Sequence, residues 1–425
     1  MTALSPPGRT RVAGHSRVHG RAAGASKAAE PTGAAAVGPR SVPAPRESGD
    51  ARHQPASLLH RAAAPYYLLL GATLLLLALG LVMVFSASSV AAFRYLDSSY
   101  AIVGKQAMWV AIGLPLMVVA SRLPVRVWRA FAYVGLIASV ALLCLVVFAG
   151  TEVNGNRNWI DFGGPFRVQP SELAKLALVI WGADLLARKH KLLTQWKHLL
   201  VPLAPVGGLV VMLVLLGGDL GTAIILIAIL CALLYAAGSP LRLFLALGTP
   251  VLLAVGAMIY SKAERLERVT GWLDPSSLDP LDGGWQGLHG KFALASGGWW
   301  GVGLGGSKEK WGGLPEAHTD FIFAILGEEL GLVGTLAVLA LFGVIGYAGL
   351  RVALHATDPF VRLASAGVTA WILVQALVNI GAVLGMLPIT GVPLPLVSYG
   401  GSALVPTLLG LGMLLSFARQ PRRRR

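Results

Sequence analysis

The chain has 425 residues, of which 35 are Lys or Arg and 20 are Asp or Glu, so 13% are charged and the formal net charge is +15. A soluble globular protein carries about 25% charged residues, whereas here the hydrophobic share is 55% and the mean hydropathy is +0.68. So few charges could not cover the core of a water-soluble protein of this length. Composition therefore excludes a cytosolic enzyme, a coiled coil and a disordered scaffold as interpretations of the whole chain.

The first 65 residues differ in composition from the rest. They are rich in Ala, Gly, Pro and Arg and show no helical period, so they cannot bury enough apolar surface to offset the entropy of ordering. We expect a disordered basic tail at 1–65, a transmembrane domain at 66–418 and a second basic tail at 419–425.

Beyond the first tail, long apolar stretches alternate with short polar loops. A membrane-spanning helix needs about 20 apolar residues, and ten stretches approach this length: 66–88, 106–121, 128–149, 172–187, 198–216, 219–236, 241–260, 319–349, 363–386 and 401–418. The pattern predicts an all-α polytopic membrane protein with about ten transmembrane helices.

The distribution of Lys and Arg predicts the orientation, because cytoplasmic loops carry more of these residues. With the N-terminus inside, 24 basic residues fall on the cytoplasmic side and 10 on the other. Both termini are therefore expected in the cytoplasm, with one large extracytoplasmic loop at about 261–318. The positive charge is explained by a membrane, so no nucleic-acid partner is expected.

The large loop contains a cluster of carboxylates. Asp274, Asp279 and Asp282 alternate with Pro, Gly and Trp, and a residue before Pro is pushed out of the helical region. These side chains could simply belong to a solvated loop. Alternatively, one of them is a general base, a role worth about 10²–10⁴-fold in rate, and the flanking Arg265 and Arg268 favour this interpretation.

Polar residues also begin two of the apolar stretches. Ser171 is typical of a helix N-cap, as is Asp219. Glu172 and Lys175 are three residues apart and can pair on one helix face. A lysine within a span is costly and is by default a functional hypothesis, which we favour over a purely structural ion pair near the membrane surface.

Two later segments place polar or irregular residues at membrane depth. Glu328 and Glu329 lie in the stretch 319–349 and indicate a polar cavity or proton path, unless they extend to the surface. Three prolines and three glycines in 387–401 prevent a continuous helix. Irregular backbone at this depth must be buried by protein or reached by water, so the segment is predicted to line a cavity.

Taken in chain order, these motifs resemble those of the SEDS (FtsW/RodA/SpoVE) family, the polytopic glycosyltransferases of bacterial cell-wall synthesis. The resemblance covers about 66–418 and is carried by 156–161, 169–172, 219–222, 315–323 with 328–329, and 387–402. Residues 315–320 and 325–329 are more similar to the cell-division members than to the elongation members.

The resemblance implies an inverting glycosyltransferase that polymerises lipid II into glycan strands at the outer face of the cytoplasmic membrane. It places the catalytic base at Asp279, which would take a proton from the 4-hydroxyl of the acceptor GlcNAc. That oxygen would attack the anomeric carbon of the donor MurNAc, and undecaprenyl pyrophosphate would leave. The sequence departs from the family pattern at Asp282, where Gly is usual, and at Trp285, where Tyr is usual.

Substrate binding is expected from the motifs and the loop. The candidates are Arg157, Trp159, Glu172, Lys175, Arg265, Arg268, Gln286, His318, Asp320, Ser398 and Gly400. No metal ligand is predicted, although a divalent cation, Mg²⁺ or Mn²⁺, could assist the departure of the pyrophosphate.

The resemblance further implies a class B penicillin-binding protein (a transpeptidase) and other membrane proteins of the division complex as partners, at the division septum. Two other functions stay open. A lipid II flippase would suit an intramembrane lysine and a broken helix, and would depend on Lys175 and Glu328 instead of a loop carboxylate. A non-catalytic scaffold of the division complex would need neither.

Overall fold

A computed structural model describes residues 63–153, 156–163, 167–190, 201–260, 263–274 and 284–419. They belong to one compact unit, Pro55–Arg425. The predicted tail at 1–65 lies outside the described residues except for its last three, and the tail at 419–425 except for its first. The segment 275–283, with Asp279 and Asp282, also lies outside them.

Helices make up most of the described chain. They are α1 (Ala64–Leu96), α2 (Ala101–Ala120), α3 (Val125–Ala149), α4 (Pro170–Arg188), α6 (Leu203–Leu216), α7 (Leu220–Ala236), α8 (Leu241–Tyr260), α9 (Ala263–Leu273), α10 (Trp285–Gly297), α11 (Ile322–His355), α12 (Pro359–Val383) and α13 (Gly401–Ala418). Each predicted apolar stretch overlaps one of these helices.

Six of the described helices, α1, α2, α3, α11, α12 and α13, are long and apolar enough to cross a membrane, and α6 and α7 are shorter apolar helices. These lengths and compositions support a multi-pass helical membrane protein. Ten crossings and two cytoplasmic termini stay predictions.

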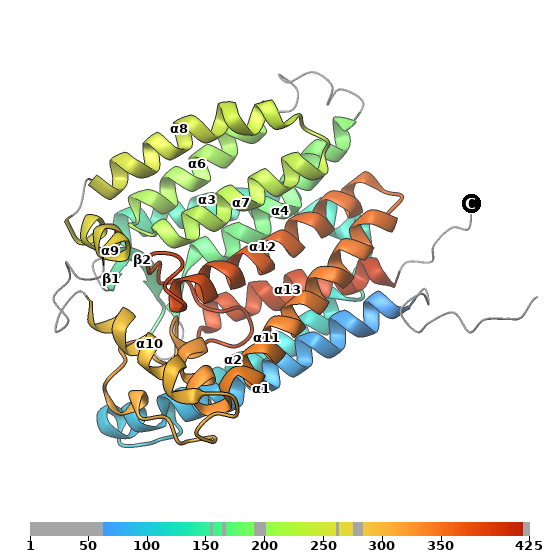
Figure 1. The fold of residues 1–425 in the computed structure, drawn as a ribbon. Helices are drawn as coiled ribbons and strands as arrows, with labels where there is room; N and C mark the ends of the chain where they lie inside the picture. The colour runs from blue at the N-terminus through green and yellow to red at the C-terminus, as the bar shows by residue number, and fades with distance from the viewer. Residues whose placement is uncertain are drawn as a thin grey trace, which may run out of the picture. The chain divides into compact units, whose positions relative to one another are not determined.

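Two helices lie at the centre of the packing (Figure 1). α12 packs against α11, α7 and α4, and α4 also packs against α3. Of the 19 residues of α4, 17 are buried. A helix that is buried all round belongs to the core, so polar side chains of α4 and α12 lie inside the protein.

A small sheet that was not predicted accompanies the helices. Between α3 and α4, the strands β1 (Thr151–Val153), β2 (Asn156–Asp161) and β3 (Arg167–Val168) form a small antiparallel sheet in the order β1-β2-β3. An ion pair of 2.9 Å joins Arg167 Nε to Asp161 Oδ2 across β2 and β3. These strands are short and polar, so they lack the apolar alternation that would predict them.

The large loop contains α9, α10 and the 3₁₀ helix η4 (Glu309–Trp311). Helix α10 packs on α11, and Trp272 Nε1 of α9 donates to Gly385 O at 3.0 Å, just after α12. The segment 275–283 therefore connects two helices with defined positions: α9, which is hydrogen-bonded to a residue just after the end of α12, and α10, which packs on α11.

Helix α11 is interrupted at Gly331, which has φ 67° and ψ −164°. Residues 298–303, which we call the strap, lie beside the break. Four hydrogen bonds join them, from the amides of Val302, Gly303, Leu332 and Val333 to the carbonyls of Glu328, Glu329, Gly298 and Trp299, at 2.9, 3.1, 2.9 and 3.3 Å. Backbone groups that the break releases are thereby satisfied, as a spanning segment requires.

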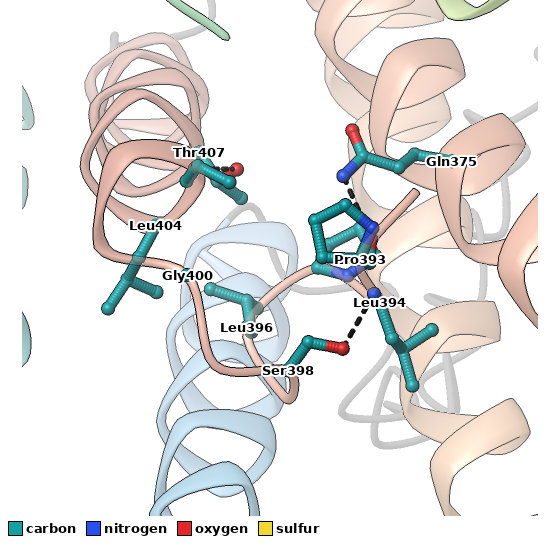
Figure 2. A pocket seen from close by; sticks show the side chains of 10 residues that line it. Gln375, Pro393, Leu394, Leu396, Ser398, Gly400, Leu404 and Thr407 are labelled. Atoms are coloured by element: carbon teal, nitrogen blue, oxygen red, sulfur yellow. Dashed lines mark hydrogen bonds between the residues drawn. The ribbon is translucent and has the colours of Figure 1, made fainter. Parts of the chain in front are cut away.

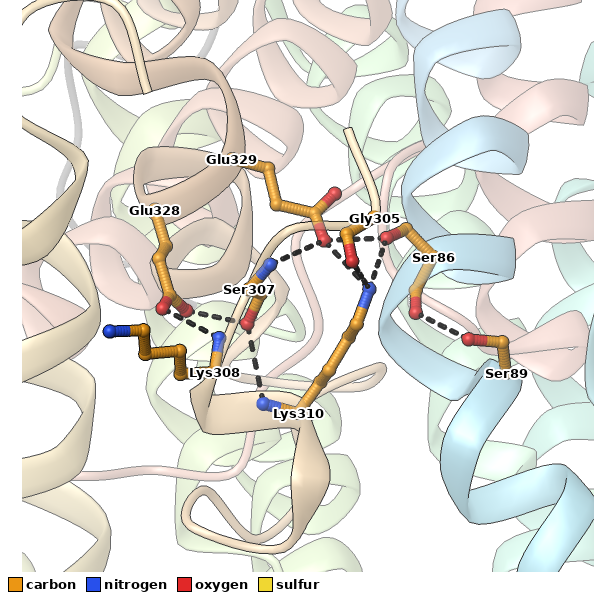
Figure 3. A network of polar contacts seen from close by, with 8 residues as sticks. All are labelled: Ser86, Ser89, Gly305, Ser307, Lys308, Lys310, Glu328 and Glu329. Carbon is orange, nitrogen blue, oxygen red and sulfur yellow. Dashed lines mark hydrogen bonds and ion pairs between the residues drawn. The ribbon is translucent and has the colours of Figure 1, made fainter. Parts of the chain in front are cut away.

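A buried polar network fixes the same region (Figure 3). Glu328 accepts hydrogen bonds from Ser307 Oγ at 2.5 Å and from the amide of Lys308 at 2.8 Å. Glu329 Oε1 accepts from Ser86 Oγ of α1 at 2.6 Å and from Lys310 Nζ at 3.1 Å. Neither glutamate extends to the surface. The structure uses both carboxylates to hold the loop against α1 and α11.

Candidate functional site

The predicted pair on α4 is present and is buried. Lys175 Nζ lies 2.7 Å from Glu172 Oε1, and the two side chains are 0% and 2% exposed. Lys175 Nζ also donates to Gln375 Oε1 of α12 at 2.9 Å. A buried ion pair needs further hydrogen bonds to offset its loss of hydration, and Gln375 supplies one.

The predicted N-cap at Ser171 is wrong. Helix α4 begins at Pro170, with Gln169 in the cap position and no side-chain cap. Pro favours the first position because its missing N–H has no partner there in any case. Ser171 Oγ is buried and has no hydrogen-bond partner among the described residues.

Two amides on one face of α12 hold the irregular segment 384–400. Gln375 Nε2 donates to Pro393 O at 3.0 Å, and Asn379 Nδ2 donates to Val392 O at 2.8 Å and to Asp320 O at 2.7 Å. The sequence analysis missed both amides. Their spacing of four residues within an apolar stretch was the available signal.

Ser398 and Gly400 shape the end of the same segment. Ser398 Oγ accepts from the amide of Leu394 at 2.8 Å. Gln106 of α2 donates to Ser398 O at 3.3 Å and accepts from the amide of Gly400 at 3.2 Å. Figure 2 shows the cavity that the segment lines with α12 and α13. Its volume of about 10 Å³ corresponds to about one water molecule.

His318 and Asp320 precede α11 and pack on this segment. The amide of Tyr399 donates to His318 O at 2.9 Å, and the two rings lie 5.6 Å apart. Burial, assisted by the charge of Glu316, raises the pKa of Asp320 to about 6. Burial lowers the pKa of His318 below its usual range. Two titratable groups with shifted pKa values therefore lie two residues apart here.

The ends of α9 and α10 approach the same place. Arg268 of α9 is exposed, and its positive charge opposes the rise in the pKa of Asp320. Gln286 of α10 donates to Pro315 O at 3.3 Å. Arg265 also lies in α9, but its side chain is outside the described residues, as is the predicted base Asp279.

The other predicted motifs reach the site from α7 and the sheet. Asp219 caps α7 as predicted, accepting from the amide of Thr222 at 2.8 Å, and also accepts from Gln169 Nε2 at 2.7 Å. A Cβ on Gly221 would lie 2.6 Å from Thr390 O, so α7 begins against the irregular segment. Strand β2 packs on α3 and α4 and carries the exposed Arg157 and the partly buried Trp159. Neither of these two contacts the Lys175 pair through a described hydrogen bond.

Within the described ranges, no three His, Cys, Asp or Glu side chains gather as a metal site. Two carboxylates of the large loop, at 279 and 282, lie outside those ranges. The divalent cation stays a prediction.

Motifs that are more than 200 residues apart in the sequence therefore meet around one irregular segment. The chain also matches the family model of cell cycle proteins of the FtsW, RodA and SpoVE type over residues 66–423. It belongs to the FtsW/RodA/SpoVE family.

Individual family members show how far the similarity extends. The probable peptidoglycan glycosyltransferase FtsW of Mycobacterium tuberculosis is 42% identical over 396 residues, covering 93% of this chain and 75% of that protein. The stage V sporulation protein E of Bacillus subtilis is 37% identical over 360 residues, covering 84% and 98%.

Two solved structures share the fold. A chain of a peptidoglycan synthase complex, studied for the coordination of polymerization and crosslinking, is 30% identical with a TM-score of 0.68, covering 83% of this chain and 96% of that one. The rod shape determining protein RodA of Thermus thermophilus is 29% identical with a TM-score of 0.63, covering 84% and 98%.

Proposed function

We propose that this chain is a peptidoglycan glycosyltransferase that polymerises lipid II at the outer face of the cytoplasmic membrane, in septal wall synthesis. The observation that carries the proposal is the convergence of the family motifs. The irregular segment 384–400 contacts the amides of α12, and both contact the residues just before α11, His318 and Asp320. Helices α9 and α10, which flank the segment 275–283 in the sequence, contact the same region. The 42% identity to proteins named probable peptidoglycan glycosyltransferase FtsW supports the same activity.

In this proposal Asp279 is the general base. It lies five residues after Asp274, which follows α9, and five before Gly284, which precedes α10, so it is close to both helices along the chain. Its carboxylate takes the proton of the acceptor 4-hydroxyl, and that oxygen attacks the anomeric carbon of the donor with inversion. The bond from this carbon to the pyrophosphate oxygen breaks, and undecaprenyl pyrophosphate leaves.

The cations near the site take different roles. The exposed Arg268, together with Arg265 and Arg157, can meet the negative charge that develops on the leaving pyrophosphate. Lys175 has no exposed surface and is held by Glu172 and Gln375. Its proposed role is therefore to fix α12, whose amides position the irregular segment, while Ser398, Gly400, Trp159 and Gln286 shape the substrate surface.

A transpeptidase of the class B penicillin-binding type is the proposed partner, together with other membrane proteins of the division complex. The polymerised strands must also be crosslinked, and one structural relative belongs to a complex that coordinates the two activities.

The test measures glycan strands formed from purified lipid II by the full chain in detergent, with and without its cognate transpeptidase. Asp279→Asn should lower the rate by about 10²–10⁴-fold. Asp274→Asn, an exposed carboxylate of the same loop, is the matched control and should retain polymerisation.

Polymerisation by Asp279→Asn at the wild-type rate would remove Asp279 from the mechanism. A wild-type chain that forms no strands with its partner, but moves lipid II across liposome membranes, would replace the glycosyltransferase by a flippase. Inactivity in both assays, with division restored in cells, would leave the scaffold.

A further inference from the structure

A second cavity, of about 820 Å³, lies at the end of the helices away from the candidate site. Helices α12 and α13 connect the two places, because Asn379 and Gly400 belong to the site, whereas Asp358 and Arg419 line the cavity. The turn between α2 and α3 and the start of α3 complete its wall. The proposed chemistry does not use this cavity, which we call the arginine pocket.

Positive charge dominates its lining. Arg122, Arg126, Arg129 and Arg419 come from three parts of the chain, and Asp358 is the single acid among the lining residues. The Asp358 carboxylate caps α12 by accepting from the amide of Phe360 at 2.8 Å. Four guanidinium groups around one acid predict an anionic ligand.

Three of these arginines have no acidic partner in the described part of the chain. Arg129 Nε pairs with Asp184 at 2.8 Å, whereas Arg122, Arg126 and Arg419 form no ion pair with a described residue and are exposed. Guanidinium groups bind phosphate oxygens through two parallel hydrogen bonds. A phosphate-bearing anion is therefore the ligand chemistry that fits.

Apolar surface runs from this pocket along two membrane-spanning helices. On α3, Arg126 is followed on the same face by Val134 and Ile137, which are 63% and 67% exposed. On α2, Leu116 and Val119 are exposed and precede Arg122, which follows the end of the helix, by six and three residues. A soluble anion would bury none of this apolar surface, whereas the acyl chains of a phospholipid bound by its phosphate would cover it.

The chain's own tails do not supply the missing negative charge. Residues 1–65 contain nine Lys or Arg and three Asp or Glu, and 420–425 contain four Arg and no acid. Both tails are therefore net positive, which favours a ligand from outside the chain.

We propose that the arginine pocket binds the phosphate of an anionic phospholipid whose acyl chains lie along α2 and α3. Basic pockets between spanning helices bind such headgroups elsewhere, and each basic residue contributes to the attraction. This assigns a lipid-binding role to the end of the protein away from the proposed chemistry, and it does not depend on that chemistry.

The test counts phosphatidylglycerol molecules retained by the detergent-purified full chain in native mass spectrometry, with phosphatidylcholine as the zwitterionic comparison. Replacing Arg122, Arg126 and Arg419 together by Gln should lower the affinity for phosphatidylglycerol at least about tenfold. The same three changes to Lys should retain most of it. Arg242→Gln, an exposed cation at the start of α8 outside the pocket, is the matched control and should bind like the wild type.

The proposal is overturned if the triple Gln variant retains the lipid, if Arg242→Gln loses as much, or if phosphatidylcholine is retained equally. Inorganic phosphate that displaces the lipid at equal concentration would identify a soluble anion as the ligand instead. A polyglutamate peptide that does so would identify an acidic protein segment. An unchanged unfolding midpoint of each variant ensures that a loss of binding is a loss of the site.

Discussion

Asp320 combines a fixed backbone with a carboxyl group that titrates near neutrality. Its carbonyl accepts from Asn379, and its carboxylate accepts from Thr319 Oγ1 at 3.0 Å. The pKa of about 6 lies above the ordinary value of 3.8, so the folded protein holds this proton more tightly than the unfolded chain does. The resulting stability is complete below about pH 4 and is lost as the pH rises through 6.

We therefore expect the free energy of unfolding to fall between about pH 4 and about pH 6, by at most about 3 kcal/mol from this group. Asp320→Asn should remove that part of the pH dependence. The measurement is the midpoint of thermal unfolding in detergent across this range. Glu316→Gln is the matched control, because it removes the repelling charge and should shift the fall to lower pH without abolishing it. An Asn variant that follows the wild-type curve would contradict the assignment.

Sequence reasoning at this scale found local pairs but not distant partners. The pairing of Glu172 with Lys175 is predicted because they lie three positions apart on a helix, and they do pair. Gln375, which accepts a further hydrogen bond from Lys175, lies 200 residues later, and helical spacing carries no information about such a partner. Ser171 was wrong as a cap because Pro170 already begins the helix.

At the scale of elements, α11 shows how a spanning helix accommodates a break. A Cβ on Gly331 would lie 2.4 Å from the amide nitrogen of Gly301 in the strap. Its positive φ is also unfavourable for any residue with a side chain. The apolar pattern of 319–349 predicted a single helix, because periodicity does not report one residue in a left-handed conformation.

Gly331→Ala should therefore lower the free energy of unfolding by about 2–3 kcal/mol. Gly343→Ala, on the same helix with nothing within 4 Å of its Cβ, should leave it unchanged or raise it by up to about 1 kcal/mol. Thermal unfolding midpoints of the two variants provide the comparison. Equal midpoints would mean that the close contact between the backbones of Gly331 and the strap does not contribute to stability.

At the scale of the whole molecule, the predicted spans assign each loop to one side of the membrane, and this assignment can be tested. Phe162, after β2, is 66% exposed and is predicted outside, whereas the exposed Arg242 is predicted inside. With Cys144 and Cys231 replaced by Ala, Phe162→Cys should react with a membrane-impermeant maleimide in sealed right-side-out vesicles. Arg242→Cys should react only after detergent is added. Labelling of both cysteines in sealed vesicles would contradict the predicted topology.

The positions of the apolar helices could be predicted because hydropathy is a local property. The meeting of the motifs could not, since it depends on how α4, α7, α12 and the loop pack together. The resemblance named residues such as His318 and Ser398, and the structure shows that His318 contacts the irregular segment to which Ser398 belongs. The small sheet and α9 escaped prediction because their sequences are short or polar.

The order in which these contacts form during synthesis differs between the two buried charged groups. The strap and the residues that bind Glu328 and Glu329 all precede α11 in the chain. The partners of α11 are therefore already synthesised when this helix is made. The ion pair of Lys175 and Glu172 lacks its hydrogen bond to Gln375 until α12 is made, 200 residues later. The packing around this ion pair is therefore incomplete until α12 is synthesised. We expect a nascent chain that stalls before α12 to expose the ion pair and to be recognised by membrane quality control.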